Sequence, residues 1–286
     1  MVQGTMEGQV FGRSIGGYDL LIRINRGSIS ELYKVQSHNT GETFAMRKLL
    51  PHLVSDSEAR ASFAAGANIE MKLDHPNIIR IFEIEVTGPE PYIIVEYVEG
   101  DNLKQWILSK SIKTIGQALK ILFDISNALN CIHSKNIIHH DIKPENILIS
   151  VNGEVKLTDF SLAVEKKKDY ISSKKISGSP SYVAPEIIRY GKYDERVDIY
   201  SLGITAYEIL SGQLPYTGNT SQEMMEKHLS RYAKPTALSR LNLEVPKKLE
   251  IAVEKAMEKN RRKRYPHVSL FLRDLKEVAR ELKVDP

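Results

Sequence analysis

The chain has 286 residues, one cysteine and a formal net charge of +4, from 40 Lys and Arg against 36 Asp and Glu. This length is enough for one large or two modest domains with a substantial core. The basic excess is far below that of nucleic-acid-binding proteins, so we expect no nucleic-acid partner. Cys131 alone cannot form a disulfide within the chain, which favours a reducing compartment. Because no apolar run approaches the roughly 20 residues of a membrane span and the start lacks a signal-peptide pattern, we expect a cytoplasmic chain without a membrane segment.

In chain order, the first elements are apolar-rich segments separated by Gly, Asn and Pro, typical of short strands at 18–24, 31–37, 43–50, 78–86 and 91–98. One helix, about 57 to 73, interrupts them with capping-type residues followed by apolar residues near helical spacing. From Leu103 onward helical patterns dominate, at 115–134, at 198–212 with Gly212 as its stop, and at about 246 to 259 and 267 to 282. A strand-rich block followed by a helix-rich block predicts an α+β fold with a cleft at the junction near 99–100.

The strongest chemical signal is the segment IIHHDIKPENILI, residues 137–149. It is followed by VKLTDF at 155–160 and by GSPSYVAPE at 178–186. These ordered motifs resemble those of the protein kinases, whose catalytic loop reads H-R-D-x-x-x-x-N, whose metal motif is D-F-G and whose activation segment ends in A-P-E. The resemblance covers roughly residues 18 to 282.

The resemblance implies a bilobal protein-kinase-like fold that binds ATP and Mg²⁺ and acts on, or docks to, another protein. After an N-terminal extension at 1–17, a small β-rich N-lobe with one main helix would occupy 18–98. A larger helical C-lobe would occupy 99–286. The oligomeric state is not implied.

Each retained polar residue of the motifs has a task by resemblance. Asp141 would orient or deprotonate the acceptor hydroxyl, and Lys143 would face the transferring phosphate. Asn146 and Asp159 would hold Mg²⁺ through hard oxygen ligands. Lys143, two residues after Asp141, is typical of the Ser/Thr branch, and Ser179 would bridge the two side chains with its hydroxyl.

Further residues resemble structural landmarks of the family. Asp198 resembles the buried aspartate that braces the catalytic loop, and Arg264 resembles the partner of Glu186 in an ion pair. The run RRKR at 261–264 could otherwise suggest nucleic-acid or nuclear-import binding, but with Arg264 assigned to the ion pair a solvated helix junction is favoured. His139 and His140 invite interpretation as metal ligands, but neighbouring residues on a short loop seldom both reach one ion, so a structural role is favoured.

The nucleotide-binding half departs from the family pattern. Of the glycine-rich loop only Gly27 remains, within NRGSIS at 25–30, so we expect a hairpin without tight phosphate coverage. The segment FAMR puts Arg47 where the family has lysine, with Ala45 on the same face of the strand. Lys48 should point the other way unless a bulge shifts the register.

The expected ion pair with the helix is also altered. Gly66 stands where the family helix has Glu, and Glu70 lies one turn further on the same face. Glu70 either pairs with Arg47 as a substitute or is a solvated surface residue. By family resemblance, adenine would lie against Val95 and would contact the backbone of Glu96 and Val98.

Two further motifs are changed in the larger block. D-F-G becomes Asp159-Phe160-Ser161, and H-R-D becomes His139-His140-Asp141. Without that Arg the chain lacks the usual cation for a phosphorylated activation loop, so modification of Ser172, Ser173 or Ser177 is expected to switch it weakly.

These losses slightly favour a pseudokinase, a regulatory or scaffolding domain with weak or absent phosphotransfer. The alternative is an active Ser/Thr protein kinase, which the retained Asp141, Asn146 and Asp159 support. Small-molecule phosphotransferases of the same fold rank last, because they usually lack a segment of the GSPSYVAPE type.

Overall fold

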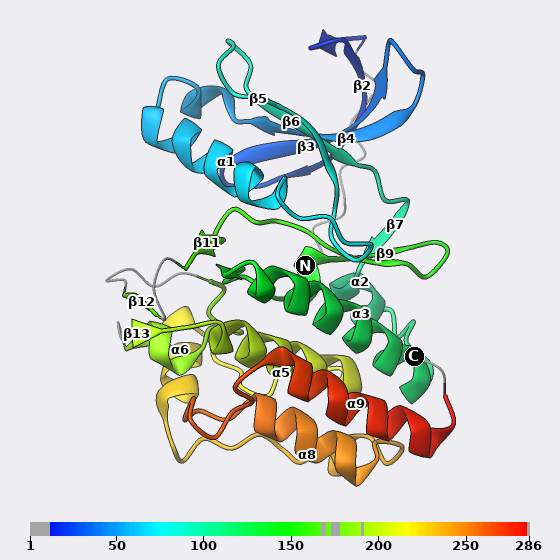
Figure 1. Ribbon diagram of the computed structural model, residues 1–286, viewed down its shortest axis with the longest axis vertical. Coiled ribbons are helices and arrows are strands. Elements are labelled where there is room, and N and C mark those ends of the chain that lie inside the picture. Colours follow the sequence, from blue (N-terminus) through cyan, green and yellow to red (C-terminus); the bar gives the residue numbers. More distant parts are fainter. Residues whose placement is uncertain (1–11, 167–169, 173–177, 190–191, 285–286) are drawn as a thin grey trace. The chain divides into compact units, whose positions relative to one another are not determined.

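The computed structural model describes residues 12–166, 170–172, 178–189 and 192–284. They divide into two compact units. One comprises the chain up to Asp74 together with Ile79–Glu99, and the other comprises His75–Ile78 and the chain from Gly100 onward. The first unit is built on a sheet and the second mainly on helices (Figure 1), which confirms the predicted α+β class.

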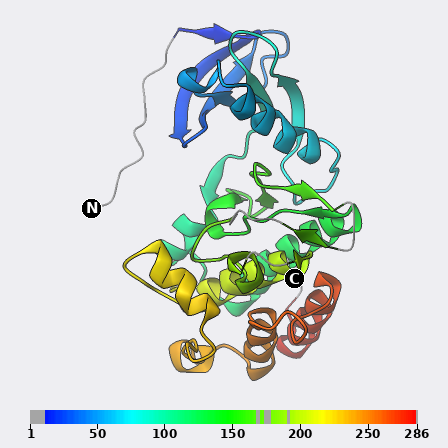
Figure 2. The same ribbon diagram turned by 90° about the vertical axis from the view of Figure 1, so that its left-hand side faces the viewer.

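The smaller unit contains a six-stranded antiparallel sheet with the order β1-β2-β3-β4-β6-β5. Its strands are β1 (Ser14–Ile15), β2 (Tyr18–Arg26), β3 (Ser30–Ser37), β4 (Thr43–Leu49), β5 (Ile81–Glu85) and β6 (Tyr92–Glu96). A short 3₁₀ turn, η1 (Pro51–Leu53), leads into the helix α1 (Ser57–Glu70). Helix α1 packs beside the sheet next to β5 (Figures 1 and 2).

Strand alternation assigns successive residues of β4 to opposite faces of this sheet. Met46 is fully buried in a cluster with Val35 and Ile94, which forms the core on one face. Ala45 and Arg47 therefore lie on the opposite face. The register of β4 shows no shift against either neighbouring strand, so no bulge disturbs this alternation.

Helix α1 is fixed at its start and in its first turns. The Asp56 side chain accepts hydrogen bonds from two N–H groups of the first turn, as an N-cap does. The Arg60 guanidinium donates to the carbonyls of Val86 and Gly88, both at 2.7 Å. The helix ends at Glu70, three residues before the sequence-based boundary, because the chain turns there and the Leu73 N–H bonds the Glu70 carbonyl.

The larger unit contains three small antiparallel sheets and most of the helices. Its strands are β7 (Gly100–Asn102), β8 (Ile137–Ile138), β9 (Ile147–Ser150), β10 (Val155–Leu157), β11 (Val164–Glu165), β12 (Ile171–Ser172) and β13 (Lys192–Tyr193). Its helices are α2 (Leu103–Leu108), α3 (Ile115–Ser134), η2 (Pro144–Asn146), α4 (Pro185–Ile188), α5 (Arg196–Ser211), α6 (Ser221–Leu229), α7 (Leu238–Leu241), α8 (Lys247–Ala256) and α9 (Val268–Leu282). Within the described ranges, no helix is long and apolar enough to cross a membrane.

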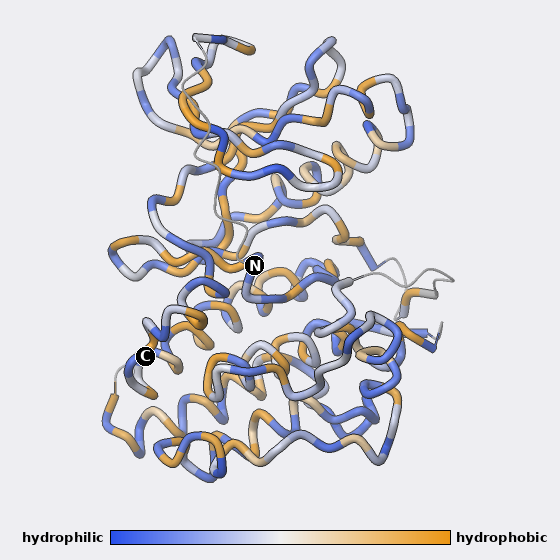
Figure 3. The backbone as a smooth tube through the Cα atoms, turned by 180° about the vertical axis from the view of Figure 1, so that it is seen from behind, coloured by the Kyte–Doolittle hydropathy of each residue, from blue (hydrophilic) through white to orange (hydrophobic). Residues whose placement is uncertain are grey.

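Helix α5 forms the centre of this unit. Every residue from Val197 to Leu210 is buried, and Gly212 ends the helix with a φ of 74°, which confirms the stop predicted from the sequence. Helices α3 and α8 pack on α5, and α9 packs on α3 and α8. In Figure 3, orange hydrophobic stretches alternate with blue hydrophilic ones along the chain, as expected when outer elements bury only one face.

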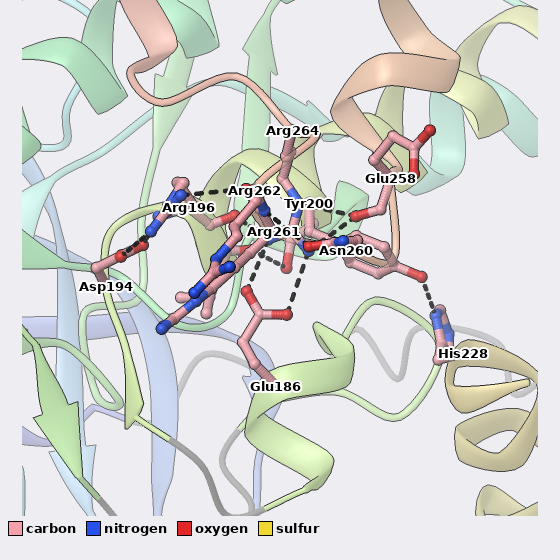
Figure 4. Close-up of polar contacts among 12 residues, drawn as sticks. Glu186, Asp194, Arg196, Tyr200, His228, Glu258, Asn260, Arg261, Arg262 and Arg264 are labelled. Carbon is pink, nitrogen blue, oxygen red and sulfur yellow. Dashed lines mark hydrogen bonds and ion pairs between the residues drawn. The ribbon is translucent and has the colours of Figure 1, made fainter. Parts of the chain in front are cut away.

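The predicted ion pair between Arg264 and Glu186 is confirmed (Figure 4). The Arg264 side chain is fully buried, and its guanidinium donates to both carboxylate oxygens of Glu186, at 2.8 and 3.2 Å. It also donates to the carbonyls of Arg196 and Glu258 and lies over the Tyr200 ring. One buried cation thus ties α4, the start of α5 and the segment after α8 together.

Replacing Arg264 with Ala should destabilise the chain by about 3–5 kcal/mol, because the substitution leaves Glu186 and two carbonyls without their donor. Chemical denaturation measures this loss. The matched control, Arg273→Ala, removes a mostly exposed arginine of α9 and should change stability by no more than about 0.5 kcal/mol. Equal stability of the two variants would contradict a structural role for Arg264.

Candidate functional site

The backbone of the loop after β8 is held by one buried carboxylate. Asp198, in the first turn of α5, accepts the backbone N–H groups of His139 and His140, each at 2.9 Å. Its Oδ2 also lies 2.9 Å from Nε2 of His133 at the end of α3. Burial acts to raise the pKa of Asp198, but the hydrogen bond and charge of His133 hold it below its ordinary value. The predicted bracing role of Asp198 is therefore confirmed, and His133 is a partner that the sequence did not reveal.

Asp141 is the centre of a polar network at the end of this loop. The Lys143 Nζ donates to Asp141 Oδ2 at 2.6 Å and to Ser179 Oγ at 2.9 Å. The Ser179 hydroxyl in turn donates to Asp141 Oδ1 at 2.8 Å. The predicted Ser179 bridge between Asp141 and Lys143 is therefore confirmed.

The same contacts set the charge of Asp141. Burial acts to raise its pKa, but the hydrogen bond and charge of Lys143, followed by hydrogen bonds from Ser179 and Asn146, hold the pKa below its ordinary value. Asp141 is thus a carboxylate at neutral pH. Gly178 makes the approach of Ser179 possible, because its φ is 101° and a Cβ there would lie 2.7 Å from the His140 carbonyl oxygen.

Asn146 and Asp159 offer oxygen atoms that suit Mg²⁺. The amide nitrogen of Asn146 donates to the carbonyl and to Oδ2 of Asp141, both at 2.9 Å, which leaves its carbonyl oxygen to face a ligand. A backbone hydrogen bond from Thr158 to Asn146 brings the neighbouring Asp159 to the same end of the larger unit. Asp159 has a φ of 65°, a conformation that is uncommon for non-glycine residues and that recurs at active sites.

This pair of side chains fits a hard cation whose remaining ligands come from phosphate and water. Among the described residues no group of three or more His, Cys, Asp and Glu side chains could hold a metal ion. A site made entirely by protein side chains is therefore not found there. The metal role of Asn146 and Asp159 stays a prediction.

His139 and His140 have structural contacts. His139 is fully buried against Phe160, with ring centroids 4.6 Å apart, and its Nδ1 accepts the Asp141 N–H. His140 packs on Tyr193, with centroids 5.2 Å apart. Burial lowers the pKa of both histidines, so both are neutral at neutral pH. His140 therefore does not supply the charge of the arginine that it replaces.

In the smaller unit, Arg47 pairs with Glu70. One guanidinium nitrogen of Arg47 lies 2.9 and 2.8 Å from the two carboxylate oxygens of Glu70, whose side chain is fully buried. This contact decides between the two alternatives left open by the sequence, and Glu70 is not a solvated surface residue. The cation and carboxylate expected of the family are thus present, one helical turn beyond the position of Gly66.

Lys48 points to the other face, as strand alternation predicts. Its Nζ lies 2.7 Å from Oε1 of Glu90, in the turn between β5 and β6. Glu90 also binds Arg13. Lys48 is therefore engaged away from Arg47 and does not replace it.

The remaining predicted nucleotide residues lie along the same sheet. Gly27 is in the turn of the β2–β3 hairpin, where its N–H bonds the Ser30 carbonyl at 2.8 Å and a Cβ would make only ordinary contacts. Ala45 and Val95 are direct cross-strand partners on the face that carries Arg47. The Glu96 N–H donates to the Arg80 carbonyl. The backbone group of Glu96 that would contact a ligand is therefore its carbonyl.

Val98 is half-buried just after β6. The ligand roles of Gly27, Ala45, Val95, Glu96 and Val98 stay predictions. The candidate modification sites Ser173 and Ser177 lie outside the described residues.

Comparison with known proteins agrees with this geometry. The chain is 31% identical over 277 residues to the probable serine/threonine-protein kinase CPE1738 of Clostridium perfringens, covering 96% of this chain and 40% of that protein. It is 33% identical over 260 residues to the probable serine/threonine-protein kinase PknB of Lactococcus lactis, covering 90% and 41%. It is 33% identical over 269 residues to the serine/threonine-protein kinase PrkC of Bacillus subtilis, covering 93% and 41%.

The chain thus spans about two fifths of the length of these relatives. Residues 18–275 match the protein kinase domain. The bilobal fold implied by the motifs, a small antiparallel-sheet lobe and a larger helical lobe, is the fold of that family. The chain belongs to the protein kinase domain family.

Proposed function

We propose that this chain is an active serine/threonine protein kinase domain that transfers the γ-phosphate of ATP to a Ser or Thr hydroxyl of another protein. The observation that carries the proposal is the network in which Lys143, Ser179 and Asn146 hold the ionised Asp141. The names of the similar proteins, which describe serine/threonine-protein kinases, support it. Phosphoryl transfer requires mainly positioning and charge stabilisation, and this network supplies both.

In this mechanism Asp141 accepts a hydrogen bond from the acceptor hydroxyl and orients its oxygen for attack. Its second contact, with Lys143, keeps a cation next to the reacting group, where negative charge is transferred. Ser179 fixes the distance between the two side chains. The hydroxyl proton leaves toward the Asp141 carboxylate as the new bond to phosphorus forms and the bond to the departing ADP oxygen breaks.

Asn146 and Asp159 would hold Mg²⁺, which when bound neutralises charge on the phosphates. Arg47, oriented by Glu70, would stabilise the phosphates of ATP from the smaller unit. Ala45 and Val95 would contact adenine, with the backbone of Glu96 and Val98 as its hydrogen-bonding partners. Gly27 would allow the hairpin backbone to approach the nucleotide.

A pseudokinase remains the second candidate. It is favoured by the loss of the outer glycines around Gly27 and by Ser161 in place of glycine after Phe160. The Arg47–Glu70 pair weakens it, because the altered ion pair was one of the losses that favoured it. We therefore rank the active kinase first.

ATP with Mg²⁺ should raise the unfolding temperature of the chain, and radiolabelled γ-phosphate should appear on a Ser/Thr protein substrate. Asp141→Asn should lower this transfer by about 10²- to 10⁴-fold, because the hydroxyl loses its carboxylate acceptor. The matched control, Asp101→Asn, changes an exposed residue of β7 and should transfer at the wild-type rate. A thermal shift without transfer would favour the pseudokinase, and neither effect would favour a scaffold.

Glu70→Gln should weaken the binding of ATP by about tenfold, because the neutral amide no longer holds the Arg47 guanidinium through a charged hydrogen bond. Titration calorimetry with ATP and Mg²⁺ measures the change. Glu58→Gln, in the exposed first turn of the same helix, is the matched control and should bind as the wild type does. Unchanged affinity in Glu70→Gln would show that the pair has no part in nucleotide binding.

A further inference from the structure

The larger unit has a pocket of about 460 Å³ that has no part in the proposed phosphotransfer. It lies where α4, the end of α6 and the segment after α8 come together. Its lining residues are Glu186, Arg189, Leu229, Arg231, Lys259, Asn260 and Arg261. Figure 4 shows three of these, Glu186, Asn260 and Arg261, beside the buried Arg264.

The lining is strongly cationic. It contains three arginines and one lysine against a single carboxylate, that of Glu186. The Glu186 carboxylate is already bound by both terminal nitrogens of Arg264. Within the described ranges none of the four lining cations forms an ion pair with a carboxylate. The pocket therefore has a positive charge that the described residues do not neutralise.

Lys259 is fixed at the pocket by three backbone carbonyls and by the ring of Tyr216, whose centroid lies 4.3 Å from its Nζ. Its Nζ donates to the carbonyls of Lys227, Ser230 and Ala233, at 2.6, 2.7 and 2.7 Å. Burial lowers its pKa to about 8, so it is still mostly charged at neutral pH. A half-buried cation without a carboxylate partner favours a nearby anion, because an anion would stabilise its charged form.

The two exposed arginines are available for a ligand. Arg189 makes one long hydrogen bond, 3.3 Å, to the Leu229 carbonyl. Arg231 lies over the ring of Tyr232, with 4.8 Å between the guanidinium carbon and the ring centroid, and donates to the Tyr232 hydroxyl. Tyr232 itself is 78% exposed, a large aromatic surface next to the pocket. A planar arginine beside an exposed aromatic ring is typical of a recognition surface.

We propose that this pocket binds a phosphorylated side chain on a segment of a protein substrate and so docks that substrate on the larger unit. Guanidinium groups match phosphate oxygens in bidentate geometry, and a phosphate monoester carries close to two negative charges at neutral pH. The volume exceeds that of a phosphate group, so the pocket also admits the side chain that bears it. The inference rests on the proposed function only for the origin of the phosphorylated residue, since a Ser/Thr kinase produces such residues.

Fluorescence polarisation without ATP tests the pocket with a short labelled peptide that carries one phosphoserine among Gly and Ala. The unphosphorylated peptide, the same peptide with Glu at that position, and inorganic phosphate as a competitor are the other probes. The phosphopeptide should bind, and the double variant Arg189→Ala/Arg231→Ala should weaken it by at least about tenfold. The matched control Arg240→Ala/Arg280→Ala removes two exposed arginines outside the lining and should bind like the wild type.

Equal binding of the phosphorylated and unphosphorylated peptides would overturn the proposal. Equally tight binding of the Glu peptide, or no binding of the phosphopeptide, would do the same. Retained affinity in the Arg189/Arg231 double variant would place the phosphopeptide elsewhere, for example at Asp141 and Lys143. The binding measurement needs no catalysis, so it tests the pocket even if the chain has no kinase activity. Phosphate transfer to an unphosphorylated peptide tests the proposed function separately.

Discussion

The larger unit depends on one buried negative charge, the carboxylate of Asp198. A buried carboxylate without donors costs several kcal/mol, so the groups around it must be placed where they can donate. Those groups are the N–H of His139, the N–H of His140 and the ring of His133. The loop backbone is consequently fixed against the central helix α5. Asp141 comes directly after His140 in the chain. The Asp198 carboxylate therefore positions the proposed catalytic carboxylate without taking part in the reaction.

In the smaller unit, the ion pair between Arg47 and Glu70 has a carboxylate that is displaced along the helix from the family position. The helix position that faces Arg47 in the family pattern is occupied by Gly66, which has no side chain to offer. Glu70 compensates because one turn of helix keeps it on the same face, and the longer reach of arginine spans the added distance. The chain therefore retains a cation and a carboxylate in contact, although arginine replaces lysine and the carboxylate lies one helical turn further along.

Arginines of one short basic segment of the larger unit have two different roles. In the run RRKR, Arg264 is fully buried and binds Glu186, whereas Arg261 lines the basic pocket. By occupying Glu186, Arg264 removes the one carboxylate that would oppose an anion there. Structural stability and the positive charge of the pocket are thus linked. His140, neutral and packed on Tyr193, contributes no such charge near the activation segment.

The sequence by itself determined the fold class, the family and the positions of Asp141, Lys143, Asn146 and Asp159, because these follow from local spacing and from the order of strands and helices. It also determined that Lys48 faces away from Arg47, since strand alternation is a local property. Only the tertiary structure decided that Glu70 reaches Arg47, that His133 supports Asp198 and that Lys259 and Arg231 line one pocket. Those contacts join residues far apart in the chain, and their distances depend on how helices and loops pack rather than on any local pattern.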